Sequence, residues 1–324
     1  MADQLRGDCL SIDGHPHLMT PVLDHLAMEG ARFRHAYSPS PTCVPARRCL
    51  LTGLTPASNG VTGMDPLSMR QRILTPTLPG LLRDAGYQTV SVGRGMHQFP
   101  THARYGFEMV HEDPFAEVYS TIHRDVLRPT ITGDPGTWPH YVGGISGNGA
   151  RSRPWPHDER YHETTWSVAK ALEFLDHRDR EAPFFLHVGF VAPHPPLIPP
   201  ASYLERYQRM ELEAPHLGDW ADDHPRLAAG AGPHFDGPWS GFELAGRWNQ
   251  ECRAGYFGSI NHIDDQLASL LSRLRCESGD TYIIFTADHG EMLGERGMWY
   301  KQTFFESSAR VPLIISLPGQ SRAR

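Results

Sequence analysis

Tyr282-Ile-Ile-Phe-Thr-Ala-Asp-His-Gly290 is a short apolar run that ends in a carboxylate and an imidazole. A run of this length and composition is typical of a buried parallel strand, although an isolated aspartate at its end would equally suit a helix cap. In open α/β sheets, ligands bind in the crevice beyond the carboxyl ends of the strands. The stretch therefore predicts a parallel sheet and predicts that Asp288 and His289 emerge together at a binding site.

The rest of the chain alternates between strand-like and helix-like segments. Residues 20–30 begin with a candidate N-cap, Thr20, followed by Pro21, and end at Gly30, with apolar side chains on one face, so they predict a helix. Further helices are predicted at residues 165–177 and 251–275, and strands at residues 87–93, 184–191, 282–286 and 311–317. This alternation predicts the α/β class, with a largely parallel central sheet flanked by helices.

Two segments carry no periodicity. Residues 131–156 and 211–240 are rich in Gly, Pro, His and Trp, and we expect long surface loops near the mouth of the site. Insertions without a role fit the same composition.

Composition limits the class of protein. A chain of 324 residues with 40% hydrophobic residues can bury a substantial core in one domain, and its net charge of −7 argues against a nucleic-acid partner. The longest apolar runs have the length of strands, so no membrane helix is predicted. Five cysteines, an odd and sparse number, indicate free thiols, and no signal peptide follows Met1, so we expect a cytoplasmic protein.

A second informative stretch is Cys43-Val-Pro-Ala-Arg47, within residues 38–53. Proline favours the first turn of a helix, so we expect a helix to begin near Pro45. Cys43 would then lie at the positive N-terminal end of that helix, with Arg47 one turn further on the same face. Five residues alone would also suit a buried thiol beside a helix start.

Cys43, Pro45 and Arg47 match a Cys-x-Pro-x-Arg signature, and with this match the chain resembles the sulfatase family of the alkaline-phosphatase-like superfamily. The resemblance continues through Ala2-Asp3-Gln4 and through residues 189–196, 256–265, 286–301 and 304–314, in the order expected for the family. Residues 294–301 and 304–306 are similar to bacterial choline-sulfatases and arylsulfatases. The likeness covers nearly the whole chain.

The resemblance implies a nucleophile and a metal ion. Cys43 would be converted to formylglycine by a formylglycine-generating enzyme, and the hydrated aldehyde would attack the sulfur of a small-molecule sulfate ester. One divalent metal ion would be held by Asp3, Gln4, Asp288 and His289. This oxygen and nitrogen set favours Ca²⁺, with Mn²⁺ or Mg²⁺ as alternatives.

The resemblance also implies catalytic groups around the nucleophile. Arg47 and Lys301 would neutralise the charge that builds on the transferring oxyanion. The proton acceptor that re-forms the aldehyde would be a histidine, with His97 and His194 as the candidates because both follow strand-like runs.

The chain departs from the family pattern in several places. Gly93-Arg94-Gly95-Met96-His97 stands where Gly-Lys-x-His is usual, so Arg94 is one residue out of register, and Met64 stands where an asparagine is common. The usual first strand would lie before Met1, so we expect Asp3 to lie on a frayed terminus, and we expect the C-terminal subdomain of the family to be missing. We therefore expect residues 1–324 to be a single sulfatase catalytic domain truncated at both ends.

Three functions are compatible with these features of the sequence. The first is hydrolysis of sulfate monoesters. The second is hydrolysis of phosphonate monoesters or phosphodiesters on the same scaffold, and the third is an inactive truncated homologue. No membrane partner is expected, and a homo-oligomer is left open.

Overall fold

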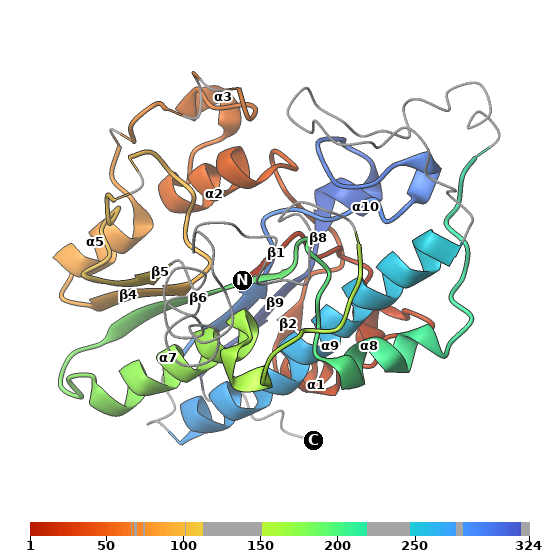
Figure 1. Cartoon of the computed structure of the whole chain (residues 1–324). Helices are drawn as coiled ribbons and strands as arrows, with labels where there is room; N and C mark the ends of the chain where they lie inside the picture. Colours follow the sequence, from red (N-terminus) through yellow and green to blue (C-terminus); the bar gives the residue numbers. More distant parts are fainter. Residues whose placement is uncertain are drawn as a thin grey trace, which may run out of the picture.

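A parallel sheet of four strands lies at the centre of the fold (Figure 1). The computed structural model describes residues 1–65, 67, 70–73, 75–100, 102–112, 151–218, 247–276 and 281–318. The strand order is β1 (Ala2–Asp3), β6 (Phe184–Pro193), β4 (Gln88–Gly93) and β5 (Met109–Glu112), and each neighbouring pair is parallel. The prediction of an α/β fold built on a largely parallel sheet is confirmed.

A second sheet of three strands continues from the first. Its order is β2 (Ala31–Arg32), β9 (Leu313–Ser316) and β7 (Ile283–Thr286), and both pairs are antiparallel. The prediction that residues 282–286 form a buried parallel strand is wrong, because β7 pairs antiparallel with β9 and Ile284 is 59% exposed. An isolated parallel bridge between Ala2 and Ala287 joins β1 to the end of β7. An apolar run reports strand preference but carries no information on pairing direction.

Proline shapes the end of the second sheet. The predicted strand at residues 311–317 divides into β8 (Arg310–Val311) and β9, because Pro312 between them lacks an N–H for a ladder. β8 pairs with β3 (Ala36–Tyr37).

Helices pack against the central parallel sheet (Figure 1). The three predicted helices are confirmed, with bounds shifted by up to four residues. Helix α2 begins at Cys43, two residues before Pro45, so the cysteine is its first residue. The helices are α1 (Pro21–Glu29), α2 (Cys43–Thr52), α3 (Pro56–Asn59), α5 (Leu78–Asp84), α7 (Glu163–His177), α8 (Ala201–Gln208), α9 (Arg247–Arg275) and α10 (Glu306–Ala309).

A carboxylate of helix α9 caps the N-terminus of α1. The backbone N–H groups of Val22 and Leu23 donate to Asp264 at 3.1 and 2.8 Å, while the hydroxyl of Thr20 donates to Asp24 instead. Thr20 occupies the N-cap position as predicted, but its side chain does not cap the helix. The cap comes from a residue 241 positions away from Leu23, which local sequence cannot reveal.

The remaining predictions have mixed outcomes. All five cysteines are free, as predicted. Within the described part of the chain, no helix has the length and apolar character needed to cross a membrane. Most of the two predicted surface loops, residues 131–156 and 211–240, falls outside the described residues, although Trp155 and Leu212 are buried.

Candidate active site

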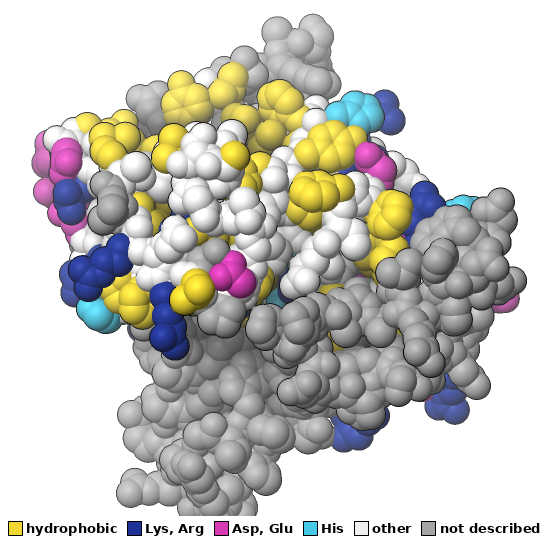
Figure 2. Space-filling view, turned by 90° about the horizontal axis from the view of Figure 1, so that it is seen from above, with side chains coloured by type: hydrophobic (Ala, Val, Ile, Leu, Met, Phe, Trp, Pro, Cys, Tyr) yellow, Lys and Arg dark blue, Asp and Glu magenta, His cyan; other side chains and the backbone are white. Residues whose placement is uncertain are grey.

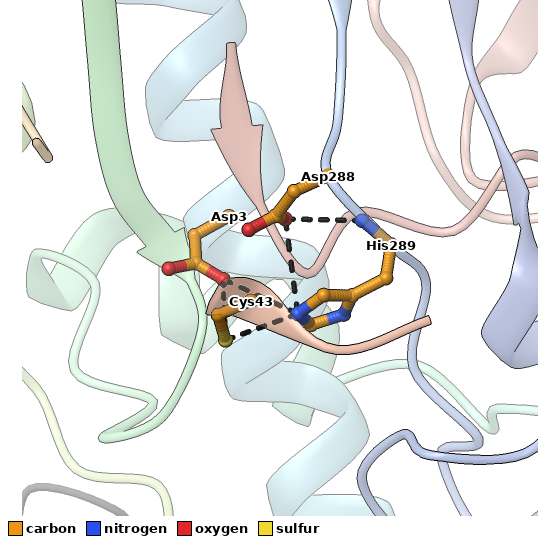
Figure 3. Close-up of side chains that lie close together, drawn as sticks. All are labelled: Asp3, Cys43, Asp288 and His289. Atoms are coloured by element: carbon orange, nitrogen blue, oxygen red, sulfur yellow. Dashed lines mark hydrogen bonds and ion pairs between the residues drawn. The ribbon is translucent and has the colours of Figure 1, made fainter. Parts of the chain in front are cut away.

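The ends of two strands and the start of α2 bring four side chains together (Figure 3). Asp3 ends β1, Asp288 and His289 follow β7, and Cys43 begins α2. One ligand atom from each residue lies within 4.8 Å of the others, and all four side chains are buried. The expectation that Asp3 is frayed is wrong, because Asp3 is fully buried in a strand that pairs with β6.

Cys43 faces an imidazole and a carboxylate. Its Sγ lies 3.2 Å from His289 Nε2 and 3.9 Å from Asp3 Oδ1. Burial raises the pKa of the thiol and Asp3 adds to this, but the positive charges of Lys301 and His289 lower that pKa below its ordinary value. The position at the first residue of a helix also favours negative charge. The site is thus built for an anionic or electron-rich group at residue 43.

Arg47 holds two carboxylates of the site. Its guanidinium is fully buried, with Nε donating to Asp288 Oδ2 at 2.8 Å and Nη2 lying 3.2 Å from Asp3 Oδ2. Nη1 donates to the carbonyl of Gly95 at 2.7 Å. Arg47 therefore positions the two aspartates, and its predicted contact with a transferring oxyanion stays a prediction.

Arg94 also belongs to the site. Its Nε donates to Asp3 Oδ2 at 2.9 Å, and its side chain is 16% exposed. The pKa of Asp3 is raised by burial, but the charges of Arg47 and Arg94 hold it well below its usual range. Although the residue is out of register with the family pattern, the structure brings its guanidinium to a predicted metal ligand. Two guanidinium groups bind Oδ2 of Asp3, and Oδ1 faces His289 and Cys43.

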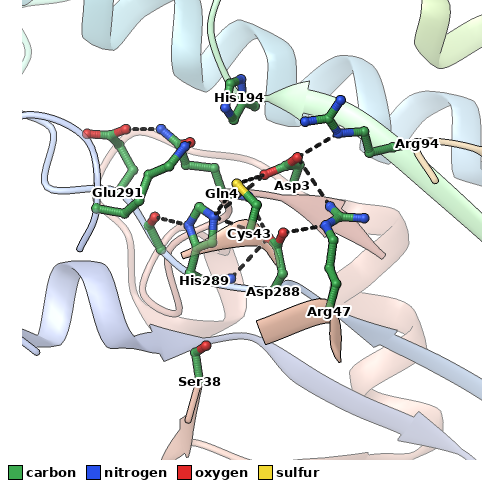
Figure 4. A network of polar contacts seen from close by, with 12 residues as sticks. Asp3, Gln4, Ser38, Cys43, Arg47, Arg94, His194, Asp288, His289 and Glu291 are labelled. Atoms are coloured by element: carbon green, nitrogen blue, oxygen red, sulfur yellow. Dashed lines mark hydrogen bonds and ion pairs between the residues drawn. The ribbon is translucent and has the colours of Figure 1, made fainter. Parts of the chain in front are cut away.

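Gln4 links the predicted metal ligands to Lys301 and to Glu291 (Figure 4). Its Nε2 donates to Glu291 Oε2 and its Oε1 accepts from Lys301 Nζ. The backbone N–H of Gln4 donates to Asp288 Oδ1 at 3.0 Å. Sequence reasoning predicted Gln4 and Lys301 but missed Glu291, although it stands two residues after His289 in the same motif.

His289 turns its Nε2 toward the centre of the cluster. Its Nδ1 donates to the carbonyl of Gly290 at 2.9 Å, which fixes the ring. Burial lowers its pKa, but the negative charge of Asp288 and the nearby Cys43 outweigh burial and raise the pKa to about 9. The negative charge around His289 that favours its protonated form would also favour a metal cation.

The two candidate proton acceptors differ in their surroundings. His194 is buried, and its Nδ1 donates to the carbonyl of Pro195 at 2.6 Å. Burial and the charge of Lys301 hold its pKa well below the ordinary value, so the ring is neutral and Nε2 carries a free lone pair. Figure 4 shows His194 facing the cluster from the end of β6.

His97 is open to solvent but lies within reach of the same charges. Surrounding protein and the charges of Arg94 and Arg47 hold its pKa well below the ordinary value. Its backbone has a φ of +53°. Both His97 and His194 stay predicted proton acceptors.

The donor set fits a divalent cation. Asp3 Oδ1 and Asp288 Oδ1 lie 3.7 and 3.8 Å from His289 Nε2, so two carboxylate oxygens and one imidazole nitrogen converge. Hard oxygen donors with one nitrogen are ligands that Ca²⁺, Mg²⁺ and Mn²⁺ accept. Gln4 contacts Asp288 Oδ1 through its backbone N–H, at 3.0 Å, and its side-chain oxygen accepts from Lys301.

The site combines strand-end carboxylates, a metal donor set and a cysteine at a helix start, which together define a hydrolase-type centre. Comparison with known proteins gives the family. The family model described as Sulfatase matches residues 1–324. The chain is 34% identical to an arylsulfatase of Clostridium perfringens over 98% of this chain and 68% of that protein. It is 31% identical to a choline-sulfatase of Rhizobium meliloti over 98% of this chain and 62% of that protein.

A solved structure has a similar fold. The phosphonate monoester hydrolase of Silicibacter pomeroyi matches with a TM-score of 0.77 and 27% identity, over 98% of this chain and 67% of that one. The chain thus belongs to the sulfatase family, a family of sulfuric ester hydrolases with the alkaline-phosphatase-like fold. It spans about two thirds of the length of the relatives that it matches.

Proposed function

We propose that the chain hydrolyses sulfate monoesters with a formylglycine made from Cys43 and a divalent metal ion held by Asp3, Gln4, Asp288 and His289. One observation carries the proposal: Cys43 Sγ, at the first residue of α2, lies within 4.8 Å of ligand atoms from two aspartates and a histidine. The family membership and the names of the two bacterial relatives support sulfate esters as the substrate class.

Formylglycine and a bound metal ion would supply the reactive oxygen and its activation. Formylglycine would provide a hydrated aldehyde as nucleophile, and the metal ion, for which we favour Ca²⁺, would polarise the sulfate and lower the pKa of the attacking hydroxyl. The chain's own residues position these groups. Arg47 and Arg94 bind Asp3 Oδ2, and Arg47 also binds Asp288 Oδ2, so that Oδ1 of each carboxylate faces His289 Nε2.

Lys301 and His194 complete the proposed chemistry. Lys301 is buried, and its charge already lowers the pKa of Cys43, so an oxyanion formed beside residue 43 would gain the same stabilisation. His194 is neutral with Nε2 unprotonated, which suits it to take the proton when the aldehyde re-forms.

The deciding experiment joins a mass measurement to a turnover assay. The chain is co-expressed with a formylglycine-generating enzyme, our proposed maturation partner, and the mass of the peptide that contains Cys43 is determined. We expect loss of the sulfur and gain of an aldehyde, together with release of sulfate from an aryl sulfate or from choline sulfate. Cys49→Ala, in the same helix, is the matched control that should leave turnover unchanged.

Two results would redirect the proposal. A fully active Cys43→Ala variant would end the formylglycine account. An ordinary thiol at Cys43 despite an active maturation enzyme, with no bound divalent metal, would favour the inactive homologue.

Phosphonate monoester or phosphodiester hydrolysis is the second candidate, supported by the structural likeness to a phosphonate monoester hydrolase. Turnover of an aryl sulfate and of the matching aryl phosphonate by one preparation would separate the two. A higher kcat/KM for the phosphonate would overturn the sulfate assignment.

We also propose a cytoplasmic location, supported by the five free cysteines. Cell fractionation checks this proposal. Gel filtration with light scattering would decide between a monomer and a homo-oligomer.

A further inference from the structure

Glu291 is a buried carboxylate that reaches the metal donor set through Gln4. Its Oε1 accepts the backbone N–H groups of Leu293, at 3.1 Å, and of Tyr300. Its Oε2 accepts from Gln4 Nε2, and the side chain is almost completely buried. Three N–H donors therefore fix the carboxylate, so its second oxygen is a rigid acceptor aimed at Gln4 (Figure 4).

The amide of Gln4 bridges two groups with opposite hydrogen-bonding character. An ionised Glu291 only accepts and the ammonium of Lys301 only donates, while an amide has one end of each kind. Nε2 of Gln4 meets Glu291 and Oε1 meets Lys301, so the observed orientation satisfies both neighbours. The reversed orientation would set N–H groups against the ammonium and an oxygen against the carboxylate.

The backbone of Gln4 is held independently of its side chain. It adopts a φ of +69°, its N–H donates to Asp288 Oδ1 at 3.0 Å, and its carbonyl accepts from Tyr256 Oη at 2.6 Å. These backbone contacts do not set the orientation of the side-chain amide. The hydrogen bonds with Glu291 and Lys301 set it.

We propose that Glu291 is a positioning residue for the metal site. It keeps the amide oxygen of Gln4 turned toward Lys301 and away from Glu291. Only that end of the amide suits a hard cation, which binds an amide oxygen and not an NH₂ group. The inference rests on the metal site of the proposed function. It also explains why glutamine is suited to position 4, since a glutamate there would set a second carboxylate against Glu291.

Glu291→Gln tests the inference in the full chain. Oε1 of the new side chain keeps the two backbone N–H groups, so its NH₂ group faces Gln4 and turns the amide of Gln4 around. We expect the Kd for Ca²⁺, measured by titration calorimetry of the metal-free protein, to rise about 10- to 100-fold. Glu306→Gln, which removes the same charge from an exposed side chain, should leave the Kd unchanged.

Two double variants separate orientation from charge. Adding Gln4→Glu to Glu291→Gln supplies a symmetric carboxylate that accepts from both neighbours, so the Kd should return to within about threefold of wild type. In a Gln4→Ala background, Glu291→Gln should change the Kd less than about twofold, because Glu291 then has no amide to orient.

Each outcome decides a separate point. No binding of Ca²⁺ or Mn²⁺ by the wild-type chain would remove the metal site itself and the proposed function with it. Binding by the wild-type chain with an unchanged Kd in Glu291→Gln, or an equal loss in the Gln4→Ala background, would overturn the role of Glu291 alone. If circular dichroism shows that Glu291→Gln does not fold, the Gln4→Glu, Glu291→Gln variant decides: folding with metal binding supports the inference, and failure overturns it.

Discussion

Arg47→Leu should expose how strongly the site depends on one buried guanidinium. Arg47 is fully buried and lies 2.8 Å from Asp288 Oδ2 and 3.2 Å from Asp3 Oδ2. Its charge is the largest influence that lowers the pKa of Asp3 against the effect of burial. Removal would leave two buried carboxylates with reduced compensation. Because removing one partner of a buried ion pair costs about 3–5 kcal/mol, we expect a loss of that size in the free energy of unfolding.

The assay is urea unfolding of the metal-free protein, followed by circular dichroism in the presence of a chelator. Arg48→Leu is the matched control, because Arg48 is also buried in α2 but donates to Gln98 Oε1 at 2.8 Å and to the carbonyl of Gln71. It leaves no unpaired carboxylate, so we expect a smaller loss of about 1–3 kcal/mol. A loss below about 1 kcal/mol for Arg47→Leu, or one no larger than that of the control, would refute the reasoning.

Three further predictions concern the nucleophile, the loop beside it and the response to pH. Cys43→Ala should abolish turnover with little change in the unfolding midpoint. Asp288→Ala should lower turnover and also the amount of bound calcium, measured by atomic emission. Full calcium occupancy in Asp288→Ala would contradict its role as a ligand. Gly290→Ala should destabilise the loop and lower metal occupancy, because a Cβ there would lie 2.1 Å from the carbonyl oxygen of Ser307, while Gly63→Ala, with open space around it, is the control for thermal unfolding. Burial lowers the pKa of His15 to about 4, and its Nδ1 accepts the backbone N–H groups of His17 and Leu18. The contribution of the neutral ring to the free energy of unfolding is therefore fully present above the unfolded pKa near 6.5. It is lost as the pH falls from 6.5 toward 4, by up to about 3 kcal/mol. His15→Asn, which keeps an acceptor, should flatten the fall in urea midpoint between pH 6.5 and 4, and an equally steep fall would contradict this assignment.

Local patterns in the sequence were enough to predict most of the secondary structure and several side chains that the fold brings together. The α1 helix followed from Pro21, Gly30 and an apolar face, and β4 and β6 followed from their apolar runs. Cys43, Asp288 and His289 were predicted from motifs of a few residues and do come together. Such patterns report the preferences of residues that are neighbours in the chain, and those preferences survive in the fold.

Tertiary structure decided which groups meet and in what orientation. The antiparallel pairing of β7 with β9 and the cap that Asp264 supplies to α1 could not be predicted, because each depends on a partner chosen by packing. The contacts of Gln4 with Glu291 and Lys301 span 287 and 297 residues of chain. The sequence by itself therefore determined the family and the helices, and it predicted the candidate site residues. The burial of Arg47 between two aspartates and the direction of the Gln4 amide come from the folded chain, because hydrogen bonds and charges are satisfied only where distant segments pack together.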